Sequence, residues 1–159
     1  MIAWIGLGSN LQGPSSRLNE ALESLRSNHH LDVLRCSSFY RTRPWGDEQQ
    51  DDFINAVVEI ETGLEPVPLL QELQAIENSM GRQRSGRRWG PRLIDLDLLL
   101  YGDRQLHTAE LEIPHPRMYE RAFVLVPLCE LDDTVEIPGR GSAASLLERL
   151  DTSGISLLV

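Results

Sequence analysis

The chain has 159 residues, of which 41% are hydrophobic and 25% charged, and this suits one globular domain with a core of its own over residues 1–159. A formal net charge of -9 argues against broad binding to nucleic acid or to an anionic membrane. No apolar run approaches the roughly 18 residues of a membrane-spanning helix, and the first residues, MIAWIGLGSN, carry no export signal. We therefore expect a cytoplasmic protein.

The first half of the chain predicts strands at residues 2–7, 31–42 and 53–62, because these stretches are short, apolar and rich in β-branched or aromatic side chains. A helix opened by Pro14 is expected after the first strand. Its apolar stripe consists of Leu18, Ala21, Leu22 and Leu25. The polar stretch 43–52 predicts a loop between the second and third strands.

A second helix is expected to start near Pro66 and to end at Gly81. Its inward side chains are predicted to be Leu69, Leu70, Leu73 and Ile76. Residues 93–101 then predict a fourth long strand, after an arginine-rich loop.

The C-terminal third predicts shorter elements. Residues 106–113 are expected to add a hairpin strand, and residues 123–131 a short apolar helix or turn whose start is limited by Pro127. Residues 143–150 predict a short helix, and residues 155–159 a last strand.

The order strand-helix-strand-strand-helix-strand is that of the ferredoxin-like split βαβ arrangement, an α+β fold with an antiparallel sheet and two helices on one face. The C-terminal third is expected to cover the other face, which gives three layers, α/β/α. No exposed apolar stripe is left over, so we expect a monomer.

Basic charge is concentrated in one short window of an acidic chain. All 15 basic residues are arginine, and the segment GRQRSGRRWGPR holds five of them and no acid. These are Arg82, Arg84, Arg87, Arg88 and Arg92. The arginine fork binds phosphate oxygens bidentately, so the window indicates an anion site, with a solvated basic loop as the alternative.

Two aspartates interrupt the most strand-like segment, LIDLDLLL. Asp95 and Asp97 are two residues apart, so in a strand they project to one face, roughly 6–7 Å apart, while Leu96 and Leu98 point into the core. Neighbouring carboxylates favour a hard cation such as Mg²⁺. A solvent-facing strand edge with two acids is the alternative. Arginines directly upstream favour phosphoryl transfer, because acids that hold Mg²⁺ and arginines that hold oxyanions are its usual components.

The remaining motifs give weaker indications of function. The sequence GLGSN lacks the third glycine of a dinucleotide fingerprint and is interpreted as a tight turn. Phe53 and Asn55 share a strand face and could stack on and hydrogen-bond a flat heterocycle, although core packing is the simpler interpretation. The chain has no lysine, which excludes a Schiff base and a GxxxxGK[ST] phosphate loop, and Cys36 and Cys129 have no metal or redox spacing.

Several stretches together resemble the 6-hydroxymethyl-7,8-dihydropterin pyrophosphokinase family of folate biosynthesis. They are the GSNL turn, SSFYRTRPWG, DFINAVVEIET, IENSMGRQR, RWGPRLIDLDLLL and PHPRMYERAFVLVPL. The resemblance covers most of residues 1–131. It implies transfer of pyrophosphate from ATP to the pterin hydroxymethyl group with release of AMP, and two Mg²⁺ ions.

The resemblance also implies the site residues. Asp95 and Asp97 would hold the metal and act in catalysis with Arg82 and Arg92. The residues implied at the ATP site are Gln74, Glu77, Arg82, Arg84, Arg88, Trp89, Arg92, Leu98, His115 and Arg121. Those implied at the pterin site are Thr42, Pro44, Trp45, Gly46, Phe53, Asn55, Trp89 and Phe123. Phe53 stands where some relatives have tyrosine, so ring stacking is expected without a hydroxyl contact.

Two other functions fit some of these features. A Mg²⁺-dependent nucleotidyl transferase could use the same sheet and paired aspartates, but it would release pyrophosphate instead of AMP. A non-catalytic nucleotide-binding module would bind ATP without turnover. The first alternative leaves the shared face of Phe53 and Asn55 without a role, and the presence of Asp95, Asp97, Arg82 and Arg92 argues against the second.

Overall fold

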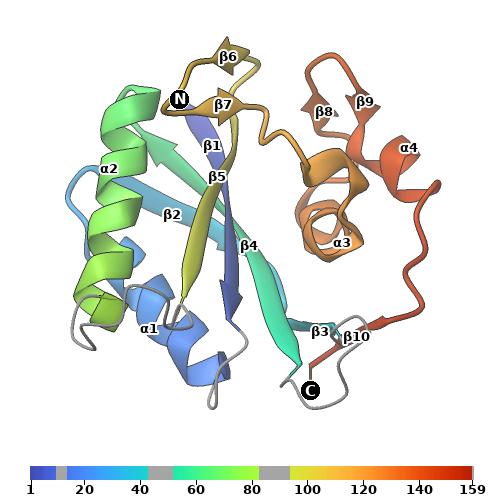
Figure 1. Ribbon diagram of the computed structural model, residues 1–159, viewed down its shortest axis with the longest axis horizontal. Coiled ribbons are helices and arrows are strands. Elements are labelled where there is room, and N and C mark those ends of the chain that lie inside the picture. The colour runs from blue at the N-terminus through green and yellow to red at the C-terminus, as the bar shows by residue number, and fades with distance from the viewer. Residues whose placement is uncertain (10–13, 43–51, 83–93, 159) are drawn as a thin grey trace.

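The structure, a computed structural model, describes residues 1–9, 14–42, 52–82 and 94–158 (Figure 1). Its centre is a six-stranded antiparallel sheet in the order β10-β3-β4-β1-β5, with β2 also paired to β4. The strands are β1 (Ile2–Ser9), β2 (Leu31–Cys36), β3 (Tyr40–Thr42), β4 (Phe53–Thr62), β5 (Asp95–Tyr101) and β10 (Ile155–Leu157).

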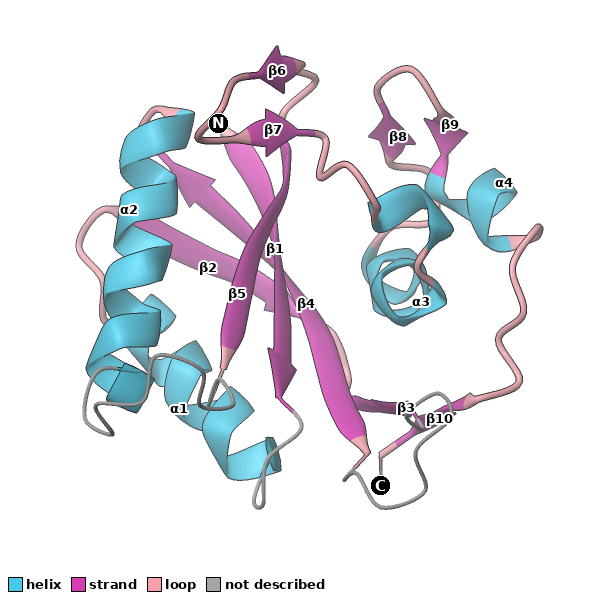
Figure 2. Ribbon diagram, viewed as in Figure 1, coloured by secondary structure: helices cyan, strands magenta, loops and turns pink. Residues whose placement is uncertain are grey.

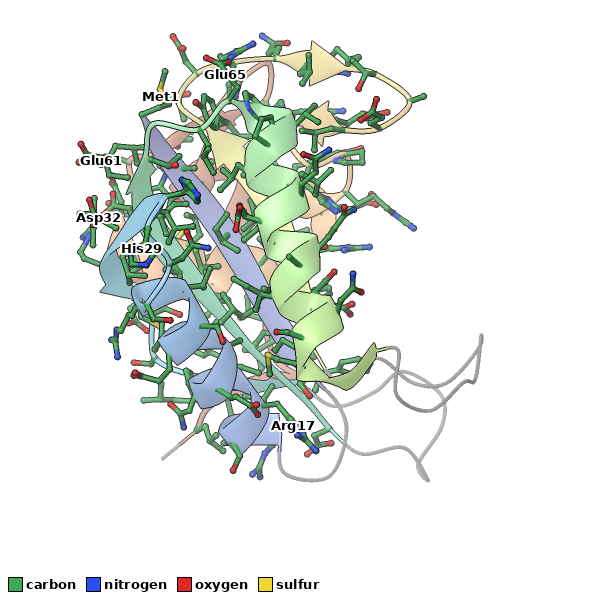
Figure 3. All side chains as sticks on the ribbon, turned by 90° about the vertical axis from the view of Figure 1, so that its left-hand side faces the viewer. Met1, Arg17, His29, Asp32, Glu61 and Glu65 are labelled. Atoms are coloured by element: carbon green, nitrogen blue, oxygen red, sulfur yellow. The ribbon has the colours of Figure 1, made fainter. Side chains whose placement is uncertain are left out.

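Helices α1 (Pro14–Arg26) and α2 (Pro66–Glu77) cover one face of this sheet and lie side by side in Figure 3. The predicted stripe of α1 is buried there, as are Leu69, Leu73 and Ile76 of α2, whereas Leu70 is half-buried. The alternate residues Ala3, Ile5 and Leu7 of β1 complete this first core.

Helices α3 (Ala122–Leu131) and α4 (Ala143–Leu147) lie on the opposite face (Figure 2). They pack over a second core that includes Trp4, Val57 and Leu99. The predicted α+β fold with a split βαβ core and three layers is therefore confirmed, with more strands in its sheet than the four of that core.

The predicted strand 31–42 is two strands, which was not anticipated. The break lies at the buried residue Ser37, whose hydroxyl accepts a hydrogen bond from the backbone N–H of Val57 at 2.9 Å. The Ser37 backbone N–H still donates to the Val57 carbonyl at 2.9 Å, but Val57 in turn donates to the Ser37 side chain, and regular pairing stops until β3 begins. β3 then pairs with β4 on one side and with β10 on the other.

Several element ends also differ from the expectation. α2 gives way to a π-helical turn (Asn78–Arg82), in which Gly81 has φ 116°, a value that favours glycine. Pro127 lies inside α3 instead of limiting its start. Residues 106–113 form a small hairpin of β6 (Leu106–His107) and β7 (Glu112–Ile113), and a second hairpin joins β8 (Glu136–Ile137) to β9 (Gly141–Ser142).

A 3-10 turn, η2 (Met118–Glu120), leads into α3. None of the helices in the described part of the chain combines the length and the apolar character that a membrane span requires.

Candidate active site

A row of four residues crosses the sheet at the end where β5 begins. Asp95 of β5 lies opposite Gly8 of β1, Gly8 lies opposite Asn55 of β4, and Asn55 lies opposite Tyr40 of β3. Side chains directly opposite each other in a sheet point to the same face. The row therefore brings an acid, an amide and a phenol to one face of the sheet, with a glycine between the acid and the amide.

Gly8 is required by the position of Asn55. A Cβ atom on Gly8 would come within 2.7 Å of the Asn55 Oδ1 atom, a distance that real Cβ contacts do not show. Asn55 is only 8% exposed, so its side chain has little space into which it could move. The interpretation of GLGSN as a tight turn is wrong, because its residues up to Ser9 belong to β1, and the role of Gly8 was not predicted. The available signal was the two-residue spacing of Gly6 and Gly8 in a strand, the same spacing as that of the two aspartates.

The two aspartates lie on the predicted face. Asp95 and Asp97 are half-buried, whereas Leu96 and Leu98 are buried in the core beneath α1 and α2. Asp97 is opposite Gly6, so each aspartate faces a neighbour without a side chain. The shared orientation of the two acids is thereby confirmed.

This donor set fits Mg²⁺. It consists of two carboxylates, and no group of three or more His, Cys, Asp or Glu side chains that could hold a metal ion occurs among the described residues. Mg²⁺ is commonly bound by one or two carboxylates and completes its six ligands with water and substrate phosphates. The chemistry of the pair is thus that of a site that takes the metal together with a phosphate ligand.

His115 lies beside this pair. Its backbone N–H donates to the Leu99 carbonyl at 2.9 Å, and its Nδ1 atom accepts from the backbone N–H of Arg117 at 3.3 Å. Burial lowers the pKa of His115, and Asp97 opposes that change, while Arg121 adds to it. A neutral ring whose Nδ1 accepts a hydrogen bond carries its proton on Nε2, so Nε2 is the donor that His115 can offer to a ligand.

α2 contributes a buried acid to the outer edge of β5. The Oε2 atom of Glu77 accepts a hydrogen bond from the backbone N–H of Leu96 at 2.8 Å, and the side chain is 6% exposed. Glu77 therefore holds the strand that carries the two aspartates. Gln74, one turn earlier on α2, is exposed. Leu98 is 3% exposed within the core, so any contact of Leu98 with a nucleotide would have to come from its backbone.

The predicted pterin residues of β3 and β4 lie together. Thr42 is directly opposite Phe53, two positions along from the pair of Tyr40 and Asn55. The Thr42 Oγ1 atom is buried and finds no hydrogen-bond partner among the described residues. Phe53 is 37% exposed, so its ring is accessible to a ligand. A buried hydroxyl without a partner beside an exposed ring is typical of a ligand site.

The start of α3 adds two further predicted residues. The guanidinium of Arg121 lies over the ring of Phe123, 5.5 Å from its centroid, within the range of a cation–π contact. The other predicted residues are not placed. Pro44, Trp45, Gly46, Arg84, Arg88, Trp89 and Arg92 lie outside the described residues, and of Arg82 only the backbone is described. Their roles stay predictions.

The sequence of residues 4–133 matches the model of the family described as 7,8-dihydro-6-hydroxymethylpterin-pyrophosphokinase (HPPK). Curated relatives carry the name 2-amino-4-hydroxy-6-hydroxymethyldihydropteridine pyrophosphokinase. The protein of Haemophilus influenzae is 44% identical over 92% of this chain and 91% of its own length. That of Bacillus subtilis is 47% identical over 85% of this chain and 80% of its own length. That of Methylorubrum extorquens is 45% identical over 96% of both chains.

Solved structures share the fold. A wild-type Plasmodium falciparum HPPK-DHPS with pteroate aligns with a TM-score of 0.74 at 14% identity, over 93% of this chain and 42% of its own. The same protein with pterin and p-hydroxybenzoate aligns with a TM-score of 0.71 at 15% identity, again over 93% and 42%. This chain therefore spans less than half of those chains. From the family match and the curated relatives together, the chain belongs to the 7,8-dihydro-6-hydroxymethylpterin-pyrophosphokinase family.

Proposed function

We propose that the polar face at the start of β5 is the active site of this pyrophosphokinase. The family reaction transfers pyrophosphate from ATP to the hydroxymethyl group of 6-hydroxymethyl-7,8-dihydropterin in folate biosynthesis, with release of AMP. ATP is the co-substrate, and the family generally uses it with Mg²⁺. The observation that carries the assignment is the row in which Asp95, Gly8 and Asn55 face the same side of the sheet.

The geometry of that row suits two substrates that must meet. β5 and β4 are separated by one strand, which puts their backbones about 10 Å apart. The acids of β5 can therefore serve the phosphates, while Asn55 and Phe53 of β4 serve the pterin ring. On β1, between them, Gly6 and Gly8 have no side chains, and the side chains of Leu99 and Asn55 approach these two positions.

The pterin would be held by β3, β4 and the start of α3. Asn55 offers both a donor and an acceptor to the edge of the heterocycle, and the rings of Phe53 and Phe123 offer surfaces for stacking. The hydroxyl of Thr42, buried without a partner among the described residues, would gain one from the ligand. Pro44, Trp45, Gly46 and Trp89 complete the proposed pocket.

The nucleotide would bind around the edge of β5, between α2 and His115. The exposed Gln74 can reach a ribose or base, and the Nε2–H of His115 can donate to a phosphate oxygen. Arg121 and the backbone of Leu98 are proposed to contact the same nucleotide. Glu77 holds β5 through its hydrogen bond from Leu96. Arg82, Arg84, Arg88, Trp89 and Arg92 are proposed to bind the triphosphate.

Asp95 and Asp97 would hold Mg²⁺, and we propose that two ions bind. The metal, when bound, supplies charge neutralisation on the phosphates and acidifies a coordinated hydroxyl. The protein provides the carboxylates, their shared orientation and the buried apolar core on the other face of β5.

The chemistry needs no protein nucleophile. The oxygen of the pterin hydroxymethyl group attacks the β-phosphorus of ATP, and the bond from that phosphorus to the bridging oxygen of the α-phosphate breaks. AMP leaves with the electron pair, and the hydroxyl proton is lost. The chain would contribute mainly by positioning both substrates, with Arg82 and Arg92 stabilising the charge that develops.

We further propose that the protein acts in the cytoplasm as a monomer. The use of ATP as co-substrate supports the location, and the few large apolar side chains exposed among the described residues support the oligomeric state. Light scattering of the purified protein would test the second point, and a dimer mass would contradict it.

A product assay tests the reaction. The protein is mixed with ATP, Mg²⁺ and 6-hydroxymethyl-7,8-dihydropterin, and the adenine nucleotides are separated by chromatography. AMP that depends on both the pterin and Mg²⁺ is expected. Free pyrophosphate would indicate nucleotidyl transfer, and bound ATP without turnover would indicate a nucleotide-binding module.

A further inference from the structure

An acid of α3 holds the beginning of β3. The carboxylate of Glu130 accepts hydrogen bonds from the backbone N–H of Ser38, at 2.9 Å to Oε2 and 3.2 Å to Oε1. The phenol of Tyr40 donates to the same Oε1 atom. One carboxylate thus receives a backbone donor and a side-chain donor from a segment that is about 90 residues away in the sequence.

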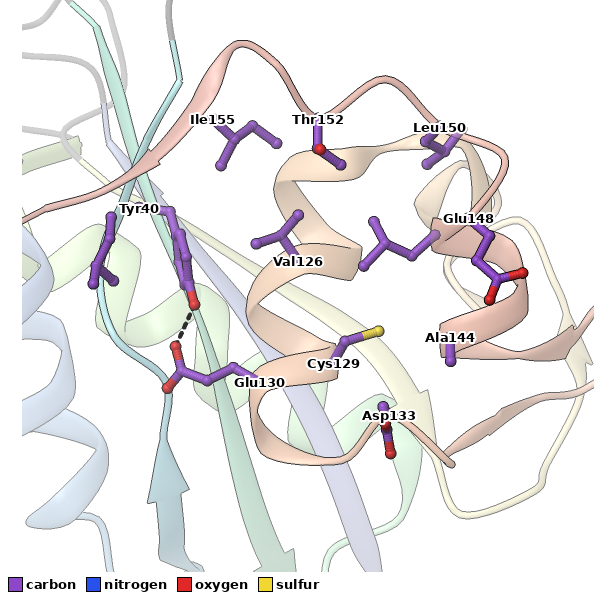
Figure 4. A pocket seen from close by; sticks show the side chains of 12 residues that line it. Tyr40, Val126, Cys129, Glu130, Asp133, Ala144, Glu148, Leu150, Thr152 and Ile155 are labelled. Carbon is purple, nitrogen blue, oxygen red and sulfur yellow. Dashed lines mark hydrogen bonds between the residues drawn. The ribbon is translucent and has the colours of Figure 1, made fainter.

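Glu130 lies beside a cavity whose charged lining residues are acidic. Tyr40 and Glu130 lie at the border of a cavity of about 850 Å³ between α3, α4 and the segment that leads into β10 (Figure 4). The charged side chains among the described residues that line it are Glu130, Asp133 and Glu148, all acidic. The donors of Ser38 and Tyr40 offset the charge of Glu130 on the side that faces β3.

The held segment is short and lies against the proposed pterin face. β3 has three residues, and its pairs with β4 are Tyr40 with Asn55 and Thr42 with Phe53. A three-residue strand has few ladder bonds, here to β4 and β10, so a further contact at its start adds to what holds it in place. Phe123 lies at the start of α3 and Glu130 near its end. The same helix therefore contributes a residue of the proposed pterin site and the acid that contacts β3.

The protonation state of Tyr40 allows its hydrogen bond to Glu130 to persist at neutral pH. Burial, the hydrogen bond to Glu130 and the charge of Glu130 together raise the pKa of Tyr40 to about 12. The phenol therefore keeps its proton at neutral pH and stays a donor to the carboxylate.

We propose that Glu130 is a positioning residue of the pyrophosphokinase reaction: its carboxylate holds β3 against β4 and thereby places the Thr42 hydroxyl opposite Phe53, where the pterin binds. The proposal rests on the proposed function of this face. It assigns to Glu130 no contact with either substrate and no proton transfer. Its effect is on binding of the pterin and not on binding of ATP.

The test compares four variants of the full chain. Glu130→Ala removes the acceptor, Glu130→Gln keeps one acceptor oxygen, and Tyr40→Phe removes only the phenol donor. Glu148→Gln is the matched control, because Glu148 is an acid of the same cavity that makes no hydrogen bond to β3 among the described residues. KM for the pterin, KM for ATP and kcat are measured for each, together with the pterin Kd by calorimetry.

For Glu130→Ala we expect KM and Kd for the pterin to rise about tenfold, in line with the loss of charge-assisted hydrogen bonds, with KM for ATP unchanged within twofold. For Glu130→Gln and Tyr40→Phe we expect a rise of about threefold, and for Glu148→Gln none. If Glu130→Ala does not fold, the two milder variants carry the same test.

The proposal is overturned if the Glu130 variants raise both KM values equally, or lower kcat alone, since loss of folded enzyme produces the latter pattern. It is also overturned if Glu148→Gln has the same effect as Glu130→Gln. Failure of the proposed function itself looks different, because the wild-type protein would then neither bind the pterin nor form AMP.

Discussion

The two faces of the central strands carry different tasks on alternate residues. On β1 and β5, Ile5, Leu96 and Leu98 are buried beneath α1 and α2. On the other face of the same strands lie Gly8, Asp95 and Asp97, which are half-buried. Successive residues of a strand point to opposite faces, so the change from core to candidate site takes place over one residue.

The two faces of the sheet also differ in how far the helices cover them. α1 and α2 bury their face along its length, whereas the core under α3 and α4 is built around Trp4, Val57 and Leu99 and stops before the two aspartates. One face can thus stabilise the sheet while the end of the other remains available to ligands. Substitutions on the two faces should therefore separate activity from stability.

The largest effect is expected from Asp97→Ala. Loss of a metal-binding carboxylate should lower Mg²⁺-dependent AMP formation at least about 10³-fold, while the free energy of unfolding changes by less than about 1 kcal/mol. Steady-state assays and urea unfolding measure the two quantities. Turnover like that of the wild type would remove this acid from the site.

On the opposite face, Ile5→Ala should do the reverse. Ile5 is fully buried, so the truncation should lower the free energy of unfolding by about 2–5 kcal/mol, and the milder Ile5→Val by about 0.5–1.5 kcal/mol. Turnover per folded molecule should stay close to that of the wild type. A loss of turnover at full folding would show that the two faces are not independent.

Glu77→Ala should affect stability at the strand edge. It leaves the buried N–H of Leu96 without its acceptor, which should cost about 1–3 kcal/mol in urea unfolding. Gln71→Ala, at an exposed position of the same helix, is the control and should change stability by less than about 0.5 kcal/mol. Equal effects of the two changes would contradict the role of Glu77 as an anchor of β5.

Gly8→Ala should act on the pterin. The new Cβ atom would displace the amide of Asn55, so KM for the pterin should rise about tenfold, a cost of about 1.4 kcal/mol. Gly63→Ala is the control, because a Cβ there meets nothing within 4 Å. In the Asn55→Ala background the effect of Gly8→Ala should largely vanish, and full additivity would exclude the clash as its cause.

The smallest effect concerns the pH dependence of stability. The pKa of Tyr40 is raised from 10.0 to about 12 in the folded protein, so folding is favoured by the protonated phenol below pH 10 and loses that contribution as the pH rises toward 12. The difference in unfolding free energy between wild type and Tyr40→Phe should therefore shrink above pH 10. A difference that stays constant from pH 8 to 11 would refute the assignment.

Local pattern predicted much of this molecule. The apolar stripe of α1, the strand β4 and the shared face of Asp95 and Asp97 all follow from periods of 3.6 and 2 residues. The interruption at Ser37 did not, because it depends on a hydrogen bond to Val57 on another strand. β10 was expected as a strand, but its pairing with β3 was not.

By itself the sequence determined the order of elements, the face of each strand that enters the core and the family to which the chain belongs. These depend on neighbours along the chain or on motifs that occur in one stretch. Only the tertiary structure decided that Gly8 stands between Asp95 and Asn55, that Glu77 holds Leu96, and that Glu130 holds Ser38 and Tyr40. Each of these contacts depends on strand register and helix placement, which are set by the packing of the whole core and cannot be inferred from local periodicity.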